Sequence, residues 1–183
     1  MAIKTILVSI RESEISERLL ETAACAALRF EAHLDVLHVR PNPANFMPYA
    51  TLGLSNGMRA SITESAERSA SEQSERLRQL FEAVCKRRKL PTRQRGETPG
   101  SPDAWWHDET GVRNEIIARR GHLADLIIVP RPYRVSPPPS SFEAAVRESG
   151  RPVLMVPRGA VTEVAVRGAA ICWNARSTEP GSG

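Results

Sequence analysis

The sequence predicts an α/β domain built on an open, doubly wound parallel sheet of five strands with helices on both faces. Short apolar runs alternate with helical segments along the chain, which is the pattern of β-α-β units. The runs are apolar throughout rather than alternating with polar residues, as is typical of strands buried on both faces of a parallel sheet. Because parallel strands are joined by right-handed crossovers, the intervening helices are expected to cover both faces.

The first strand, helix and second strand lie near the N-terminus. Ile3 to Ile10 is a run rich in β-branched residues and predicts a buried strand. Ser13 is the expected N-cap of a helix that reaches about Glu31, since apolar residues recur at helical spacing along it. Leu34 to Val39 predicts the second strand, which ends at Pro41 because proline cannot continue a sheet ladder.

The middle of the chain predicts a loop over residues 42–56 and a helical stretch from Met58 to Lys89. Apolar residues mark one face late in this stretch, whereas Ser61 to Ser74 is polar and is expected to be exposed and to fray. Trp105 to His107 is the best candidate for the third strand, and Thr92 to Arg95 is a weaker one.

The remaining elements follow in regular alternation. Gly150 is expected to end a short helix that Ser141 caps, and Pro157 to close the last strand of the sheet. The predicted elements are a helix over Val112 to Arg120, a strand over Leu126 to Val129, a loop over Arg131 to Pro139, a helix bearing Phe142, Ala145 and Val146, a strand over Val153 to Val156, and a sixth strand over Glu163 to Trp173 before a loose polar tail.

The net charge of +4 does not by itself indicate a nucleic-acid partner, because charges of both signs are interleaved along the chain. The densest basic cluster is Lys86 to Lys89, with Arg93 and Arg95 close by. It is either a patch for an anionic partner or the cationic C-terminus of a helix. We favour the second interpretation because no nucleic-acid-binding motif accompanies the cluster.

The cysteines and the N-terminus predict a cytoplasmic protein. Cys25, Cys85 and Cys172 are odd in number and widely spaced, which argues against a disulfide framework or a zinc site and suits a reducing compartment. The opening residues lack the long apolar region and cleavage site of a signal peptide. No apolar stretch approaches the ~18 residues that a membrane span needs.

Several stretches resemble the universal stress protein family. Lys4 to Val39 resembles its first strand, helix and second strand, His122 to Pro132 its fourth strand, and Glu148 to Gly159 its fifth strand. Ala169 to Glu179 is similar to the start of the second half in tandem members. The resemblance implies a domain over residues 1–158, an extra strand and loose tail over 159–183, and the strand order 3-2-1-4-5. It also implies dimerisation, a role in stress tolerance, and ATP binding in one branch of the family but not in the other.

The candidate ligand site lies at the carboxyl ends of the strands, where doubly wound sheets bind ligands. By the resemblance, ATP-binding members place Asp where Arg11 stands, and follow strand four with G-x2-G-x9-G-(S/T). Here Pro130, Arg131 and Pro132 follow that strand, and proline has no N–H to offer a phosphate. Arg134 is a further cation that can attract an anion. The candidate binding residues are Ile10, Arg11, Val39, Pro130, Arg131, Ser140 and Ser141.

Other motifs were weighed as sites. Gly53 to Gly57 fits the nucleophile elbow G-x-S-x-G around Ser55, but no buried strand precedes it, so we expect a flexible loop. Asp103 with His107 or His122 has no support as the rest of a triad. The four histidines lack metal-ligand spacing. Trp105 and Trp106 are expected to pack on opposite faces of a strand rather than to stack on a base.

Three functions are therefore considered. The favoured one is a non-enzymatic, stress-protein-like domain that acts by binding or protein interaction, without catalytic residues, metal or cofactor. The alternative is a switch that binds ATP and hydrolyses it weakly, and the third is a hydrolase that uses Ser55. We also expect a homodimer through the apolar edge strand Val153 to Val156, with the sixth strand packed across the same edge. The expected core comprises Leu7, Val8, Leu37, Ile127, Ile128, Leu154 and Val156.

Overall fold

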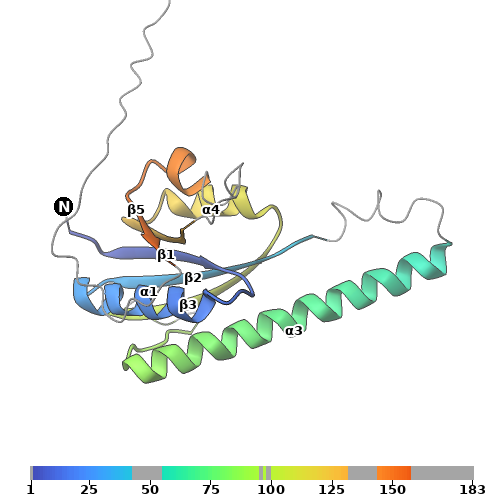
Figure 1. Ribbon diagram of the computed structural model, residues 1–183, viewed down its shortest axis with the longest axis horizontal. Coiled ribbons are helices and arrows are strands. Elements are labelled where there is room, and N and C mark those ends of the chain that lie inside the picture. The colour runs from blue at the N-terminus through green and yellow to red at the C-terminus, as the bar shows by residue number, and fades with distance from the viewer. Residues whose placement is uncertain (1, 43–54, 95–96, 98–99, 132–143, 158–183) are drawn as a thin grey trace, which may run out of the picture.

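The computed structural model describes residues 2–42, 55–94, 97, 100–131 and 144–157. Strands and helices alternate along the chain, as the sequence predicts (Figure 1). The elements are β1 (Thr5–Ile10), α1 (Ser16–Phe30), β2 (His33–Arg40), α3 (Asn56–Arg88), β3 (Asp103–Thr110), α4 (Arg113–Gly121), β4 (Leu126–Pro130), η2 (Ala144–Glu148) and β5 (Val153–Val156). η2 is a single turn of π-helix.

The five strands form one parallel sheet in the order β3-β2-β1-β4-β5, which confirms the predicted fold class and strand order. β1 lies at the centre, and its Val8 pairs with Val36 of β2 on one side and Ile128 of β4 on the other. The chain runs outward from β1 in one direction and then returns to build the other half. The point where the strand order reverses therefore lies between β1 and β4.

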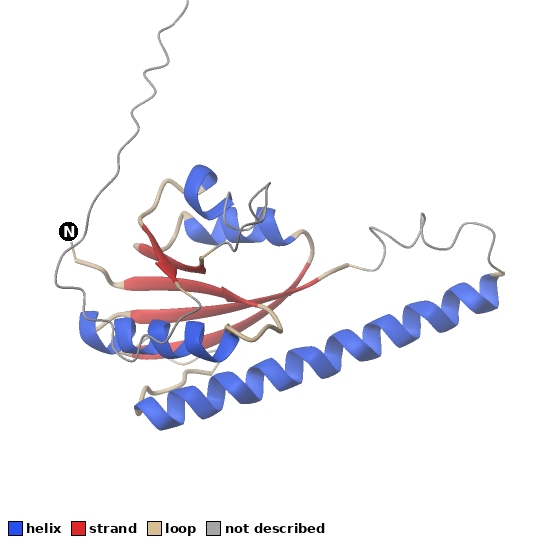
Figure 2. Cartoon of the chain, in the orientation of Figure 1, coloured by secondary structure: helices blue, strands red, loops and turns tan. Residues whose placement is uncertain are grey.

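Helices cover both faces of the sheet (Figure 2). Alternate residues of the central strands point to opposite faces. Ile6 and Val8 pack with α1 and with the second half of α3, whereas Leu7 packs with α4 and η2. Six of the seven expected core residues are at most 2% exposed, namely Leu7, Val8, Leu37, Ile127, Ile128 and Val156. The prediction for Leu154 was wrong: it is only partly buried, because β5 is an edge strand.

Two element boundaries differ from the prediction. Ile15, not Ser13, occupies the N-cap position of α1, where no side chain caps the helix, and the Ser13 carbonyl instead accepts a bond of 3.1 Å from the Ser16 N–H. β3 is longer than expected, because it pairs with β2 along its whole length. The weaker strand candidate near Thr92 is a single bridge to Ala104.

The long helix α3 packs on the sheet through its second half only. Ser55 caps it, accepting a bond of 3.3 Å from the Met58 N–H. The polar stretch that starts at Ser61 is largely exposed, as expected, but it is continuous helix rather than frayed, and it extends past the sheet in Figure 1. Ser74, at the end of this stretch, is buried, and its hydroxyl is satisfied by donating to Asp108.

The basic cluster at the end of α3 occupies the last helical turn, as the favoured interpretation predicts. Arg87 pairs with Glu17 at 2.8 Å, and Arg88 pairs with Glu21, both on α1. These carboxylates offset the charge of the two guanidiniums. Through Arg87 and Arg88 the cluster therefore joins α3 to α1.

Several predictions fall on residues outside those described. They concern Gly53, Arg134, the cap at Ser141 and the strand over Glu163 to Trp173. Among the described residues, no helix has the length and apolar character required to cross a membrane.

Candidate functional site

The carboxyl ends of β1, β2 and β4 bring together several predicted site residues. Ile10 and Val39 are buried at the ends of β1 and β2, and Arg11 follows β1 as an exposed cation. Pro130 is partly buried at the end of β4. Arg131 is exposed, and its backbone N–H donates to the Val156 carbonyl at 2.8 Å, so this N–H is committed to the β4–β5 ladder. Ser140 and Ser141 lie outside the described residues.

Arg113, which the sequence analysis did not single out, connects the ends of β1 and β2. Its Nη1 donates to the Ile10 carbonyl at 3.2 Å and to Ser9 Oγ at 3.3 Å. Its Nη2 donates to the Val39 carbonyl at 3.2 Å. The guanidinium thus occupies backbone acceptors of both strands at the carboxyl end of the sheet, where ligands of such sheets bind.

A tight turn after β3 places Arg113 at this point. Gly111 has a φ of 154°, a value that side-chain-bearing residues rarely adopt, and its N–H donates to the Arg40 carbonyl at 3.0 Å. α4 then begins at Arg113. A general signal was available in the sequence: the first residue of a helix that directly follows a strand lies near the carboxyl end of the sheet.

Arg113 carries its charge in a partly buried setting. Burial lowers the pKa of its guanidinium, and the nearby positive charge of Arg11 lowers it further. No carboxylate among the described residues forms an ion pair with Arg113 or Arg11. Within the described part of the chain, the Arg113 guanidinium therefore bonds only to neutral oxygens.

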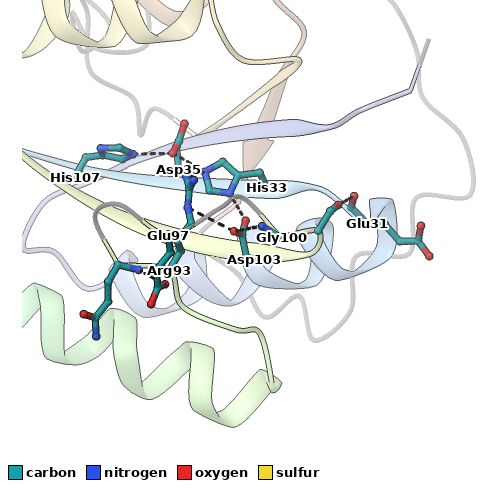
Figure 3. A network of polar contacts seen from close by, with 10 residues as sticks. Glu31, His33, Asp35, Arg93, Glu97, Gly100, Asp103 and His107 are labelled. Atoms are coloured by element: carbon teal, nitrogen blue, oxygen red, sulfur yellow. Dashed lines mark hydrogen bonds and ion pairs between the residues drawn. The ribbon is translucent and has the colours of Figure 1, made fainter.

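A second polar cluster links β2 to the edge strand β3 (Figure 3). Asp35 Oδ1 lies 3.0 Å from His33 Nε2 and 2.7 Å from His107 Nε2. A further hydrogen bond joins His33 Nδ1 to Asp103 Oδ1. Arg93, from the segment before β3, lies with Nη2 3.1 Å from His33 Nε2 and with Nε 3.6 Å from Asp103 Oδ2.

The charges in this cluster stabilise one another. Burial acts to lower the pKa of His33, but its hydrogen bonds to Asp35 and Asp103 outweigh burial and raise that pKa. Burial acts to raise the pKa of Asp35, but the hydrogen bonds from His107 and His33 hold it below its ordinary value. Because hydrogen bonds and ion pairs join side chains of both strands, we interpret the cluster as a clamp between them, in which the Arg93 Nε–H forms an ion pair with Asp103 but no hydrogen bond.

The two tryptophans lie on opposite faces of β3, as the alternation of a strand predicts. The Trp106 ring lies 5.7 Å from Phe81 and 6.0 Å from His38, and it packs against the core beneath α3. Trp105 lies on the other face, with its ring 4.3 Å from His107 and 4.5 Å below the Arg93 guanidinium. Both rings therefore have packing partners within the chain.

The other chemical motifs do not assemble into a site. Ser55 caps α3, while Asp103 and His107 bond to other partners in the clamp. Among the described residues, no group of three or more His, Cys, Asp or Glu side chains is placed to hold a metal ion. Cys25 and Cys85 are free thiols, and burial raises the pKa of Cys85 to about 12, which keeps it protonated.

The comparisons with known proteins agree with the fold. No protein-family model and no curated protein matches the sequence. The universal stress protein UspA from Lactobacillus plantarum is similar in structure, with a TM-score of 0.60 at 18% identity over 85% of this chain and 99% of that one. A protein of the same family from Burkholderia pseudomallei gives a TM-score of 0.51 at 19% identity, covering 85% of this chain and 97% of that one.

A universal stress protein from Archaeoglobus fulgidus also matches, with a TM-score of 0.51 at 15% identity over 85% of this chain and 94% of that one. At such identities the similarity establishes the fold. The similar structures therefore confirm, over most of the chain, the fold that the order and spacing of the predicted strands implied.

Proposed function

We propose that this chain is a universal stress protein-like domain that acts by binding or protein interaction, catalyses no reaction, and has a degenerate nucleotide site. The observation that carries the proposal is the position of Arg113. Its guanidinium bonds to the carbonyls of Ile10 and Val39, at the carboxyl end of the sheet where a nucleotide would bind. A base or sugar placed there would have to displace it.

The segment after β4 supports the same proposal. Phosphates are commonly held by backbone N–H groups in glycine-rich loops. Pro130 and Pro132 have no N–H, and the N–H of Arg131 is already bonded to Val156. The backbone at Pro130 to Pro132 therefore has no free N–H with which to replace a glycine-rich phosphate loop.

The alternative is a domain that binds ATP and hydrolyses it weakly. The cations Arg11, Arg113 and Arg131 near one end of the sheet favour an anionic ligand of some kind. In this alternative, Ser140 and Ser141 would supply donors to the phosphates. We favour the first function because the alternative needs backbone donors that the segment from Pro130 to Pro132 lacks.

Titration with ATP distinguishes the two functions. In isothermal titration calorimetry with magnesium we expect no complex of micromolar or higher affinity, because the backbone donors are missing and Arg113 occupies the carbonyls at the ends of β1 and β2. Mass spectrometry of the purified, denatured protein should likewise release no nucleotide. A micromolar, magnesium-dependent ATP complex would show that the alternative is correct.

The two edges of the sheet suggest how the domain interacts with partners. At the β3 edge, the Arg93 N–H donates to the Ala104 carbonyl and the Ala104 N–H donates to the Pro91 carbonyl, both at 2.8 Å, so the preceding segment covers the start of this edge. Within the described part of the chain, β5 has a strand on one side only, and Met155 is 48% exposed. An open apolar edge of this kind favours pairing with another strand.

We infer that two copies associate through β5 about a two-fold axis, with the segment Val164 to Trp173 packed at the same edge in its own chain or in its partner. By the same inference, residues 159–183 correspond to the beginning of a second repeat. In this arrangement the partner copy covers the edge that the described chain leaves open.

A charge at the β5 edge should separate the two copies. Met155→Arg would bring two positive charges close to the proposed two-fold axis, so light scattering at micromolar concentration should show a dimer for the wild type and a monomer for the variant. Ile62→Arg, at an exposed position on α3, is the matched control and should remain dimeric. A wild-type monomer, or a Met155→Arg dimer, would contradict this inference.

A further inference from the structure

Part of the Arg113 guanidinium has no partner among the described residues. A guanidinium has five N–H donors in a planar fork. Nη1 uses its two on Ser9 Oγ and the Ile10 carbonyl, and Nη2 uses one on the Val39 carbonyl. The Nε–H and the second Nη2–H remain without an acceptor in the described part of the chain. Such a pair of donors matches two oxygens of a phosphate or carboxylate group.

The charge at this point also lacks compensation. Among the described residues, no carboxylate pairs with Arg113, and the charged group that acts on it is the cation Arg11. A positive charge that is partly buried beside another is costly unless an anion is bound. In addition, no side chain caps the N-terminus of α4, whose first residue is Arg113, so the helix dipole adds to the positive potential.

We propose that this end of the sheet binds a small oxyanion of the phosphate class, held by the free edge of the Arg113 guanidinium and by Arg11. This inference rests on the proposed function, because Arg113 occupies the strand carbonyls and leaves an anion, without a base or sugar, as the ligand that fits. The three bonds to β1 and β2 keep the guanidinium in place, so the free edge is oriented before the anion arrives.

Calorimetric titration of the full chain with inorganic phosphate, at constant ionic strength, tests this site. We expect saturable binding to the wild type and to Arg119→Gln, a control on the same helix whose side chain is exposed and pairs with Glu109 at 2.5 Å. Arg113→Gln should weaken phosphate binding about tenfold or more, the ratio expected when a hydrogen bond to a charged group is lost. Arg11→Gln should also weaken phosphate binding. Because Arg11 is exposed, this variant should fold, and it tests the site even where Arg113→Gln does not fold.

The outcomes separate this inference from the proposed function. Phosphate binding that depends on Arg113 and Arg11, together with absence of an ATP complex, would support both. No saturable phosphate binding, or equal binding by the wild type, Arg113→Gln and Arg11→Gln, would overturn the oxyanion site and leave the proposed function standing. ATP that binds much more tightly than phosphate would overturn both, since the base and sugar would then contribute to binding.

Discussion

Replacement of Ile128 by alanine is expected to lower the free energy of unfolding by about 2–5 kcal/mol, the usual cost of truncating a core side chain. Ile128 is 0% exposed and lies in β4, between the central strand β1 and the edge strand β5. It packs on the side of the sheet covered by α1, so the lost atoms would leave a cavity that the neighbouring strands cannot readily fill. Urea denaturation followed by circular dichroism measures the change.

Ile62→Ala is the matched control for this experiment. It removes the same atoms from an exposed position on α3, so the free energy of unfolding should change by no more than about 0.5 kcal/mol. A loss below about 1 kcal/mol for Ile128→Ala would contradict the central, buried position of β4.

Replacement of Asp103 by alanine should lower the free energy of unfolding by about 3–5 kcal/mol, as is typical when one partner of a buried charged cluster is removed. Asp103 is 3% exposed, accepts a bond of 2.9 Å from the Gly100 N–H, and bonds to His33. Its removal would take a hydrogen-bond acceptor from His33 and an ion-pair partner from Arg93, both of them largely shielded from water. The same denaturation measurement applies.

The pH dependence of stability shows whether the clamp causes this loss. The pKa of His33 is raised in the folded protein, so its contribution is fully present below about pH 6.5, the ordinary value, and is lost as the pH rises through the raised pKa. In Asp103→Ala one of the two carboxylates that raise this pKa is gone. The decline in stability above pH 6.5 should therefore be smaller than in the wild type, and an unchanged decline would mean that Asp103 does not act through His33.

The fold could be predicted because its determinants are local in the sequence. Leu126 to Val129 and Val153 to Val156 are apolar runs that are too short for an ordinary helix and contain β-branched residues, and helical segments separate them. The ends of the strands could be predicted for the same reason, so Ile10, Arg11 and Val39 were correctly placed near the carboxyl ends of β1 and β2.

The contacts between distant segments could not be predicted in this way. His33 and Asp103 are 70 residues apart and meet because the register of β2 and β3 sets them opposite each other. β3 itself contains Asp108 and Glu109, which are poor strand formers, and its length follows from pairing with β2 rather than from its own sequence. Arg113 was missed because its role depends on where α4 begins relative to two strands that precede it.

The two edges of the sheet differ in how they resist pairing with a strand of another chain. A sheet with two open edges can add copies at both sides without end and grow into a fibre. Here Pro91 and Arg93 bond to Ala104 alone, near the start of β3, so the rest of this strand has an unpaired side within the described part of the chain. The remainder of the β3 edge carries Asp108 and Glu109 rather than an apolar run, and charged side chains of this kind oppose edge-to-edge pairing, whereas β5 carries none.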